Sequence, residues 1–490
     1  MGLPQLASNA TRAWERVTEM PGFATIAFVV VVNVALTLLT GLETLRDFPN
    51  SADEYAYVLA AETFAEGKLS VPSPDPREPF SYTHVINDGR FYGKYPPGWS
   101  FLLSFGTRAG VPWLVNPLFG AFFVIAVYAV ARRHFSTPVA NIAALSMVAN
   151  PYVIFNAASY FSHTSCLFFC TAFFWGYLAV LSGQRRRQDS VGMGLAAGLA
   201  FLARPYTAIV IFTPLLVYLL WRASRTGTFR AAIVSLAWAA LPALACFSIF
   251  LAYNYLQTGD PWVQPFQKYD PHDKPSLSGM YQDFFSRLRD HVAYRLLELG
   301  LWLPLSPLFA AAYFLTPEGR RNPKGVALEL AFAGLFTGYF LYWGSGINQY
   351  GPRYLHEATG VLVLMSALLV SRYQKWNVLI VTGLLLMNIS TLWTATRYHA
   401  RDVDERMEVY KLAESQAVAP AVIFLKTGSG TMPIGDLTRN GIHFDGSFLY
   451  VWDSGPDMNR RLLDRHPGRR AYAYRYDRGT RAGQLLPYEP

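Results

Sequence analysis

The run GFATIAFVVVVNVALTLLTG at residues 22–41 carries no charged side chain and is long enough to cross a membrane as one helix. Comparable apolar runs recur along the 490-residue chain, of which 52% is hydrophobic and only 15% is charged. This pattern excludes an ordinary soluble domain and predicts a polytopic α-helical membrane protein. We expect about eleven transmembrane helices, near residues 22–41, 113–132, 138–157, 160–182, 190–203, 205–221, 231–255, 296–315, 326–343, 353–371 and 376–394.

Basic side chains predict the orientation of these spans, because Lys and Arg are retained on the cytoplasmic side of short loops. Every basic cluster can be cytoplasmic if the amino terminus lies inside and the carboxyl terminus outside. The same rule explains the formal net charge of +9, which therefore does not indicate a nucleic-acid partner. The clusters are Arg12 with Arg16, Arg132 with Arg133, Arg185 to Arg187, Arg222 with Arg225 and Arg230, Arg320 with Arg321 and Lys324, and Arg372 with Lys375.

Three domains follow from this topology. Residues 1–21 place Leu3, Leu6 and Trp14 on one helical face, which predicts a short interfacial helix on the cytoplasmic leaflet. Residues 22–395 form the transmembrane domain, with outer loops at 42–112 and 256–295. Residues 396–490 resemble a small extracytoplasmic α/β domain, with strands expected at 422–425, 448–452 and 471–476 and a helix at 458–465.

The first outer loop contains the residues that are the strongest candidates for a reaction site. Ser51 to Glu66 is expected to form a helix lying flat on the membrane, with Ser51 as its cap and Asp53 and Glu54 in its first turn. The two carboxylates either complement the helix dipole or form part of a reaction site, and composition alone leaves both interpretations open.

Lys94 follows in the same loop, within Gly93-Lys94-Tyr95-Pro96-Pro97-Gly98. An ammonium group at this position suits a lipid-linked phosphate, with the Tyr92, Tyr95 and Trp99 rings at headgroup depth. The alternative is an ordinary lysine whose stem lies along apolar surface while its charge reaches water.

Arginines occur at two further outer positions. Arg204 separates two apolar halves and is expected at the tip of an outer hairpin. Arg353 and Glu357 are spaced i, i+4 at the outer entry of a span, so they either pair with each other or leave the guanidinium for a phosphate.

Other polar residues give weaker signals. His163 at the outer end of a span is by default an interfacial histidine, although it could accept a proton or contact a sugar. The cluster Tyr269-Asp270-Pro271-His272-Asp273 is better explained as a loop turn than as a metal site. The three cysteines, Cys166, Cys170 and Cys246, all lie in expected spans as packing residues.

These residues together resemble the polytopic C-type (GT-C) glycosyltransferases that use polyprenyl-phosphate sugars, in particular the branch of protein O-mannosyltransferases and lipid A aminoarabinose transferases. The likeness runs from the first span to the last. In that family an acidic residue early in the first outer loop acts as a base or orients the acceptor, and Asp53-Glu54 occupies that place. A lysine before paired prolines is tied to the donor phosphate, which Lys94 matches with one additional residue. Many members carry a second acidic residue where this chain has His163.

The resemblance implies an inverting transfer at the extracytoplasmic face, with Asp53 as the catalytic base and Glu54 in reserve. Lys94, with Arg353 or Arg204, would stabilise the departing polyprenyl phosphate. The acceptor would be a glycan, a glycolipid or a protein, and no cofactor is required, although a divalent cation is compatible. The short loops and the arginine bias are typical of a bacterial plasma membrane. Further candidates for substrate binding are Tyr57, Tyr95, His163, Tyr350 and Glu357.

Two other classes of membrane protein share parts of this pattern. An outer-face ligase or polymerase with a pyrophosphate-linked donor would have the same topology and arginines, so the donor it consumes would distinguish it. A lipid or sugar transporter should place charges or broken helices near the midplane of several spans. A non-catalytic assembly subunit would tolerate the loss of Asp53.

Overall fold

The structure is a computed structural model, and it describes residues 22–184, 186–272, 286, 288–342, 347–348, 350–426, 439–477 and 479–489. The interfacial helix expected within residues 1–21 lies outside the described residues, as do Arg185 and Asp273.

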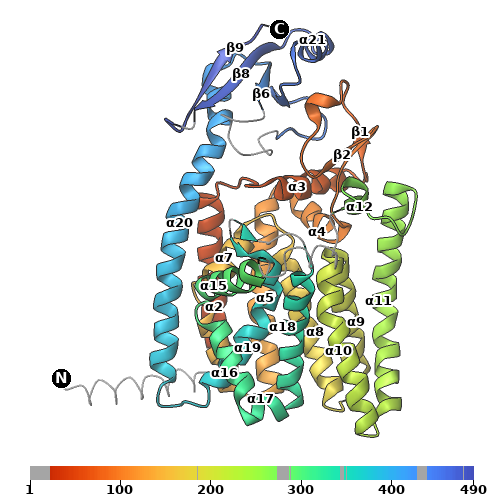
Figure 1. The fold of residues 1–490 in the computed structure, drawn as a ribbon, viewed down its shortest axis with the longest axis vertical. Coiled ribbons are helices and arrows are strands. Elements are labelled where there is room, and N and C mark those ends of the chain that lie inside the picture. The colour runs from red at the N-terminus through yellow and green to blue at the C-terminus, as the bar shows by residue number, and fades with distance from the viewer. Residues whose placement is uncertain are drawn as a thin grey trace, which may run out of the picture.

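A bundle of long helices forms the body of the molecule (Figure 1). Within the described residues, seven helices are long and apolar enough to cross a membrane, or up to nine if two bent pairs each count as one span. The two remaining predicted spans are also helical, namely α9 with 17 residues and α18 with 18. The helices of the bundle include α2 (Gly22–Leu39), α5 (Pro112–His134), α8 (His163–Leu181), α9 (Arg187–Ala203), α10 (Pro205–Arg225), α11 (Phe229–Thr258), α18 (Pro323–Phe340), α19 (Thr359–Val370) and α20 (Asn377–Gln416).

Two of the expected straight spans are wrong in shape, because each is a bent pair of helices. The span at 138–157 consists of α6 (Thr137–Ser146) and α7 (Pro151–Ala158), which meet at 65°. The span at 296–315 consists of α15 (Arg295–Trp302), preceded by a π-helix at Arg289–Tyr294, and α16 (Ser306–Leu315), with a bend of 108°. Residues with left-handed backbone occupy both breaks, Ala149 with φ 55° and Leu305 with φ 58°.

Asparagine side chains satisfy the backbone groups exposed at the α6–α7 break. Asn33 of α2 accepts a hydrogen bond from the Ala149 N–H at 3.2 Å. Asn388 of α20 donates to the carbonyls of Ser146 and Val148, each at 3.0 Å, and accepts one from Asn150. Non-helical backbone within a bundle is tolerated where such partners are supplied.

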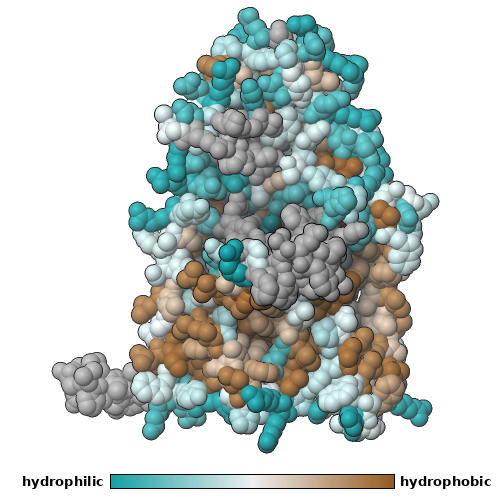
Figure 2. All heavy atoms as spheres, in the orientation of Figure 1, coloured by the Kyte–Doolittle hydropathy of each residue, from teal (hydrophilic) through white to brown (hydrophobic). Residues whose placement is uncertain are grey.

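An apolar band crosses the visible face of the bundle, and hydrophilic surface lies above and below it (Figure 2). The arginines of α5, α10 and α17 (Pro317–Arg321) lie in the last turns of those helices, at the end opposite the carboxyl terminus (Figure 1). This distribution is that of an integral membrane protein with its basic loops on one side.

The first outer loop forms a layer across the other end of the bundle (Figure 1). Its helix α3 (Ala52–Ala65) begins where expected, because the Ser51 hydroxyl accepts the Glu54 N–H. A three-stranded antiparallel sheet in the order β1-β3-β2 and helix α4 follow. The elements in and next to the first outer loop are η1 (Thr40–Thr44), α3, β1 (Val71–Pro72), η2 (Glu78–Phe80), β2 (Val85–Asn87), β3 (Arg90–Gly93) and α4 (Pro97–Arg108). Later outer segments form α12 (Pro265–Tyr269), β4 (Ile347–Asn348), β5 (Gly351–Pro352) and η4 (Arg353–Ala358).

The carboxyl-terminal domain lies above this layer. Its sheet has the order β7-β6-β8-β9, with β6 parallel to both neighbours and β9 antiparallel to β8. The three expected strands and the expected helix are present, and β9 was not predicted. The boundary expected at 395 falls inside α20, which continues to Gln416. The elements are β6 (Ala421–Leu425), β7 (Phe448–Trp452), α21 (Pro456–Arg465), β8 (Arg470–Asp477) and β9 (Ala482–Pro487).

A shared hydrophobic core joins α3 to this domain. Tyr55 of α3 and Phe80 of the first outer loop pack in one cluster with Phe424, Leu449 and Leu462 of the domain. The Tyr55 hydroxyl also donates to the Asn440 carbonyl at 3.0 Å. The helix that carries Asp53 is therefore held from above as well as by the bundle.

Candidate active site

Asp53 lies in the first turn of α3, where groups from three distant segments meet its carboxylate. Arg353 Nη1 of η4 is 3.2 Å from Oδ2, and His84 Nε2 is 3.7 Å from Oδ1. The Tyr95 hydroxyl donates to Oδ1. The Asp53 side chain is 21% exposed, so it is shielded but still reachable from solvent.

The surroundings of Asp53 favour its ionised form. Burial raises the pKa of this carboxyl, but the charges of Arg353 and His84, the Tyr95 hydrogen bond and the charge of Lys94 together outweigh burial and hold the pKa below its ordinary value. An ionised carboxylate can accept a proton from an attacking group.

Glu54 faces the protein interior, although it is adjacent to Asp53 in sequence. Its Oε2 accepts hydrogen bonds from the Asn50 N–H at 3.0 Å and the Ser51 hydroxyl at 3.1 Å. Its Oε1 accepts the Tyr160 N–H at 2.9 Å. Glu54 is fully buried, so it fastens the start of α3 to the segment that precedes α8.

Lys94 is buried among aromatic rings at the end of β3. Its Nζ lies 4.4 Å from the centre of the Phe266 ring, 4.7 Å from that of Tyr269 and 5.4 Å from that of Tyr95. The ammonium also contributes to the field at Asp53. Cation–π contacts favour an ammonium group in this position without neutralising it.

Arg353 points toward Asp53 and not toward Glu357, so the two residues spaced i, i+4 do not pair. Its guanidinium carbon lies 4.9 Å from the centre of the Phe161 ring, and its side chain is 18% exposed. Among the described residues, its Nε has no hydrogen-bond partner.

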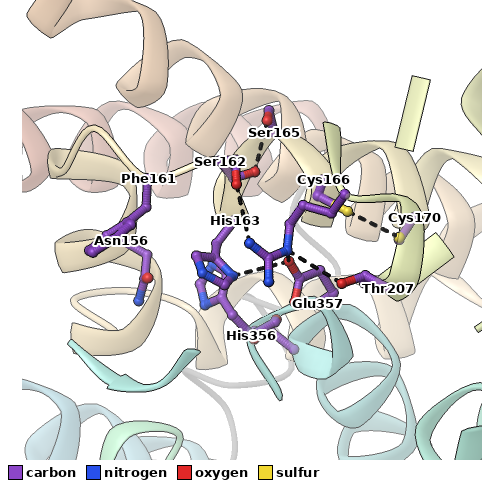
Figure 3. Close-up of polar contacts among 12 residues, drawn as sticks. Asn156, Phe161, Ser162, His163, Ser165, Cys166, Cys170, Thr207, His356 and Glu357 are labelled. Atoms are coloured by element: carbon purple, nitrogen blue, oxygen red, sulfur yellow. Dashed lines mark hydrogen bonds and ion pairs between the residues drawn. The ribbon is translucent and has the colours of Figure 1, made fainter. Parts of the chain in front are cut away.

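Glu357 belongs to a second polar cluster (Figure 3). Its Oε1 lies 3.1 Å from both Arg204 Nε and His163 Nδ1. Arg204 also donates to the Ser162 hydroxyl and the Tyr339 hydroxyl, each at 3.2 Å. Arg204 lies between α9 and α10 as expected, but it is paired within the bundle and does not form an exposed tip.

Tyr57 connects the two clusters. Its hydroxyl lies 3.0 Å from the Ser162 hydroxyl, and its ring stacks on that of Tyr95 at 4.3 Å. A chain of contacts therefore runs from Asp53 to the Arg204–Glu357 pair, by hydrogen bonds except for the ring stack between Tyr95 and Tyr57.

Tyr350 is separate from this path. It is 1% exposed, its ring stacks on Phe155, and its carbonyl accepts a hydrogen bond from Asn156. Its surroundings are those of a core residue.

Comparisons with known proteins agree with this architecture. A family model described as dolichyl-phosphate-mannose-protein mannosyltransferase matches residues 96–253. The structure of ArnT from Cupriavidus metallidurans bound to undecaprenyl phosphate is similar at a TM-score of 0.54 and 13% identity, with 92% of each chain covered. The apo state of ArnT from the same organism gives 0.55 and 12%, with the same coverage.

The chain has the GT-C fold. The expected resemblance to the aminoarabinose transferase and O-mannosyltransferase branch is thereby confirmed, and family model and fold together support a membrane glycosyltransferase. The Archaeoglobus fulgidus oligosaccharyltransferase in its apo form matches at a TM-score of 0.45 and 13% identity, over 81% of this chain and 58% of that chain. A search of curated proteins finds no match to the sequence.

Within this GT-C chain, the fold brings together Asp53, Lys94, Arg353 and Tyr95, while Glu54 lies outside the site. The sequence did not predict a role for His84. Its ring contacts Asp53 because of how the segment before β2 folds, and the spacing of the two residues in the sequence does not indicate this contact. The sequence also did not predict roles for Phe161 and Ser162. In the part of the chain that the structure describes, no group of three or more His, Cys, Asp or Glu residues could hold a metal ion.

Proposed function

We propose that the chain transfers a sugar from a polyprenyl-phosphate donor to an acceptor hydroxyl or amine at the extracytoplasmic face of a bacterial plasma membrane. Asp53 is the base, and Lys94 and Arg353 bind the donor phosphate. The acceptor is a glycan, a glycolipid or a protein. One of the similar structures, that of ArnT, contains bound undecaprenyl phosphate, which supports a polyprenyl-phosphate partner for this chain.

The observation that carries this proposal is the 3.2 Å contact between Asp53 and Arg353. Lys94 also acts electrostatically on the Asp53 carboxylate. A carboxylate and two basic side chains are thus held together at the outer end of an apolar bundle. This arrangement suits a reaction in which a proton is removed while an anion departs. Arg353 uses a single Nη donor for Asp53, so a guanidinium with five N–H groups retains others for a phosphate.

The proposed step balances as a single displacement. The acceptor oxygen or nitrogen attacks the anomeric carbon, and its proton goes to Asp53. The bond between the anomeric carbon and the phosphate oxygen breaks, and its electron pair leaves with the polyprenyl phosphate. The configuration at the anomeric carbon inverts. Lys94 and Arg353 offset the charge of the leaving phosphate, so we propose that no divalent cation is needed.

Arg204 and Glu357 act in this proposal as positioning residues. Their pair holds the Ser162 hydroxyl, which contacts Tyr57 beneath the Tyr95 ring. The Arg204 guanidinium is already occupied by partners within the bundle, since it meets Glu357, Ser162, Tyr339 and Thr207. Of the two candidate arginines, Arg353 is therefore the one assigned to the phosphate.

The test is sugar transfer in membranes, with a panel of radiolabelled polyprenyl-phosphate and polyprenyl-pyrophosphate sugars, each with and without a chelator. Asp53→Asn and Lys94→Ala are compared with Asp457→Asn and Lys426→Ala, two exposed positions of the carboxyl-terminal domain. We expect one monophosphate donor to react, and Asp53→Asn to lower the rate by about 10²- to 10⁴-fold. The two control variants should stay within about twofold of the native rate.

Three outcomes would overturn the proposal in different ways. Full activity of the Asp53→Asn variant would exclude Asp53 as the base. Consumption of a pyrophosphate donor alone would indicate a ligase or polymerase. Loss of transfer with the chelator, restored by a divalent ion, would overturn the metal-free step and leave the rest intact.

A further inference from the structure

Two adjoining cavities lie where α10 ends and α11 begins. These helix ends lie at the end of the bundle opposite α3, the helix that carries Asp53 (Figure 1). The volumes of the two cavities are about 200 Å³ and about 330 Å³. Both are lined by Thr228, Ala231 and Ser235 of the first turns of α11, so they form one groove. The groove continues to Arg187 and Ser190 at the start of α9.

The groove is basic, and none of its described lining residues is acidic. Arg187 and Arg230 line the larger cavity, and Arg222 lines the smaller one. None of these three has an ion-pair partner among the described residues. Other arginines at this end are paired, since Arg133 contacts Asp189 at 2.6 Å and Arg372 contacts Glu318 at 2.5 Å.

Two serines also contribute hydroxyl groups to the groove. Ser190 is 1% exposed and Ser235 is 5% exposed, and both line the larger cavity. A hydroxyl can donate a hydrogen bond to a phosphate oxygen. The start of α11 borders the same space, because Gly227, Thr228, Arg230 and Ala231 line it, and Thr228 provides no side-chain cap for the first N–H groups of the helix.

Arg187 is held in a geometry that suits a phosphate. Its guanidinium carbon lies 3.7 Å from the centre of the Trp238 ring. Stacking uses the face of the guanidinium and leaves the N–H groups at its edge for a bidentate contact. Tryptophan is enriched at the depth of the lipid headgroups in membrane proteins, which is consistent with a headgroup beside Trp238.

We propose that this groove binds the phosphodiester headgroup of an anionic phospholipid in the leaflet opposite the candidate active site. A lipid is favoured over free phosphate because the groove opens beside lipid-facing apolar surface. Val234 lines the cavity and is 53% exposed, and Phe229 and Ile233 are 47% and 44% exposed. Basic pockets between helices on the cytoplasmic side recognise such headgroups.

The test measures lipid binding to the purified full chain by native mass spectrometry, with phosphatidylglycerol or phosphatidylcholine in mixed micelles. The double variant Arg187→Gln/Arg230→Gln is compared with Arg132→Gln/Arg225→Gln, which removes the same charge from exposed positions that line neither cavity. We expect the first variant to bind phosphatidylglycerol about 30-fold more weakly and the control to change by less than about threefold.

A second variant, Arg187→Lys/Arg230→Lys, keeps the charge that sets membrane orientation but loses the bidentate geometry. It should bind more weakly than the native chain and more tightly than the glutamine variant. Equal binding by both glutamine variants, or equal binding of the two lipids, would overturn the site. Displacement of phosphatidylglycerol by an equal concentration of inorganic phosphate would overturn the lipid as occupant. None of these readouts depends on sugar transfer.

Discussion

At the scale of single residues, Asp53 and Glu54 show how adjacent carboxylates acquire separate roles. One helical step of about 100° turns Asp53 toward Arg353 and Glu54 toward the Tyr160 N–H. The sequence predicted an acidic pair in the first turn of a helix, and that part is confirmed. Which of the two faces the cations could not be predicted, because it depends on where the segment before α8 crosses α3.

We expect Glu54→Gln to lower stability more than Asp53→Asn does. The glutamine amide keeps one acceptor oxygen where the carboxylate serves three donors, and a buried donor left without a partner costs about 1–3 kcal/mol. The melting temperature of the purified protein in one detergent measures this difference. If Glu54→Gln has the same melting temperature as the native chain but abolishes sugar transfer, Glu54 acts in the chemistry and the assignment of Asp53 as the base is wrong.

The same carboxyl should make stability depend on pH. Burial raises the pKa of Glu54 to about 7, against the opposing hydrogen bonds from Tyr160, Ser51 and Asn50, whereas the unfolded group has its ordinary value of 4.5. Because the folded pKa is the higher one, its contribution is fully present below about pH 4.5 and is lost as the pH rises through about 7. The loss amounts to roughly 3 kcal/mol.

Glu54→Gln removes this titration, so its melting temperature should fall less than that of the native chain between about pH 5 and pH 8. Glu62 of the same helix also has a pKa raised by burial to about 7. It therefore adds to the change of melting temperature with pH in both the native chain and the variant. Parallel melting curves for the native chain and the variant across this range would contradict the assignment.

At the scale of elements, the positions of the helices were predictable and their breaks were not. Apolar length predicted a helix at every expected span, because bilayer thickness sets that length. The break between α6 and α7 depends on Asn388, which lies 238 residues from Asn150 in sequence and binds it across the bundle. The hydrophobic periodicity of one segment cannot indicate a hydrogen-bond partner that lies far away in the sequence. Arg353 and Glu357 are similar, since their spacing allowed a pair and tertiary partners separated them.

The link between α3 and the carboxyl-terminal domain gives a prediction at this scale. Leu462 of α21 is fully buried in the cluster that also contains Tyr55 of α3. Leu462→Ala should cost about 2–5 kcal/mol and should lower sugar transfer, because α3 carries Asp53. Leu486→Ala is the matched control, since Leu486 is 38% exposed in β9 of the same domain.

Protease sensitivity of the first outer loop and transfer rate per folded molecule measure this coupling. If Leu462→Ala loosens the carboxyl-terminal domain while the transfer rate stays native, the domain does not hold α3 in place.

At the scale of the whole molecule, hydropathy and charge predicted a bundle between two polar ends, and the apolar band in Figure 2 agrees with it. The sequence also predicted most of the carboxyl-terminal domain, because its strands alternate with turn residues. It did not predict β9, whose pairing with β8 brings together residues that show no strong alternation of their own. Nor did it predict that α20 would carry the domain upward as one helix of 40 residues.

The orientation of the bundle yields the last prediction. The positive-inside rule puts the ends of α5 and α10 in the cytoplasm and α21 outside. The native cysteines, Cys166, Cys170 and Cys246, are free and buried, so an introduced thiol should be labelled above a low background. In intact cells, a membrane-impermeant maleimide should label Asp457→Cys and should label Arg225→Cys only after permeabilisation. The reverse pattern would place the Asp53 site in the cytoplasm, where an extracytoplasmic acceptor could not reach it, and the proposed function would fail with it.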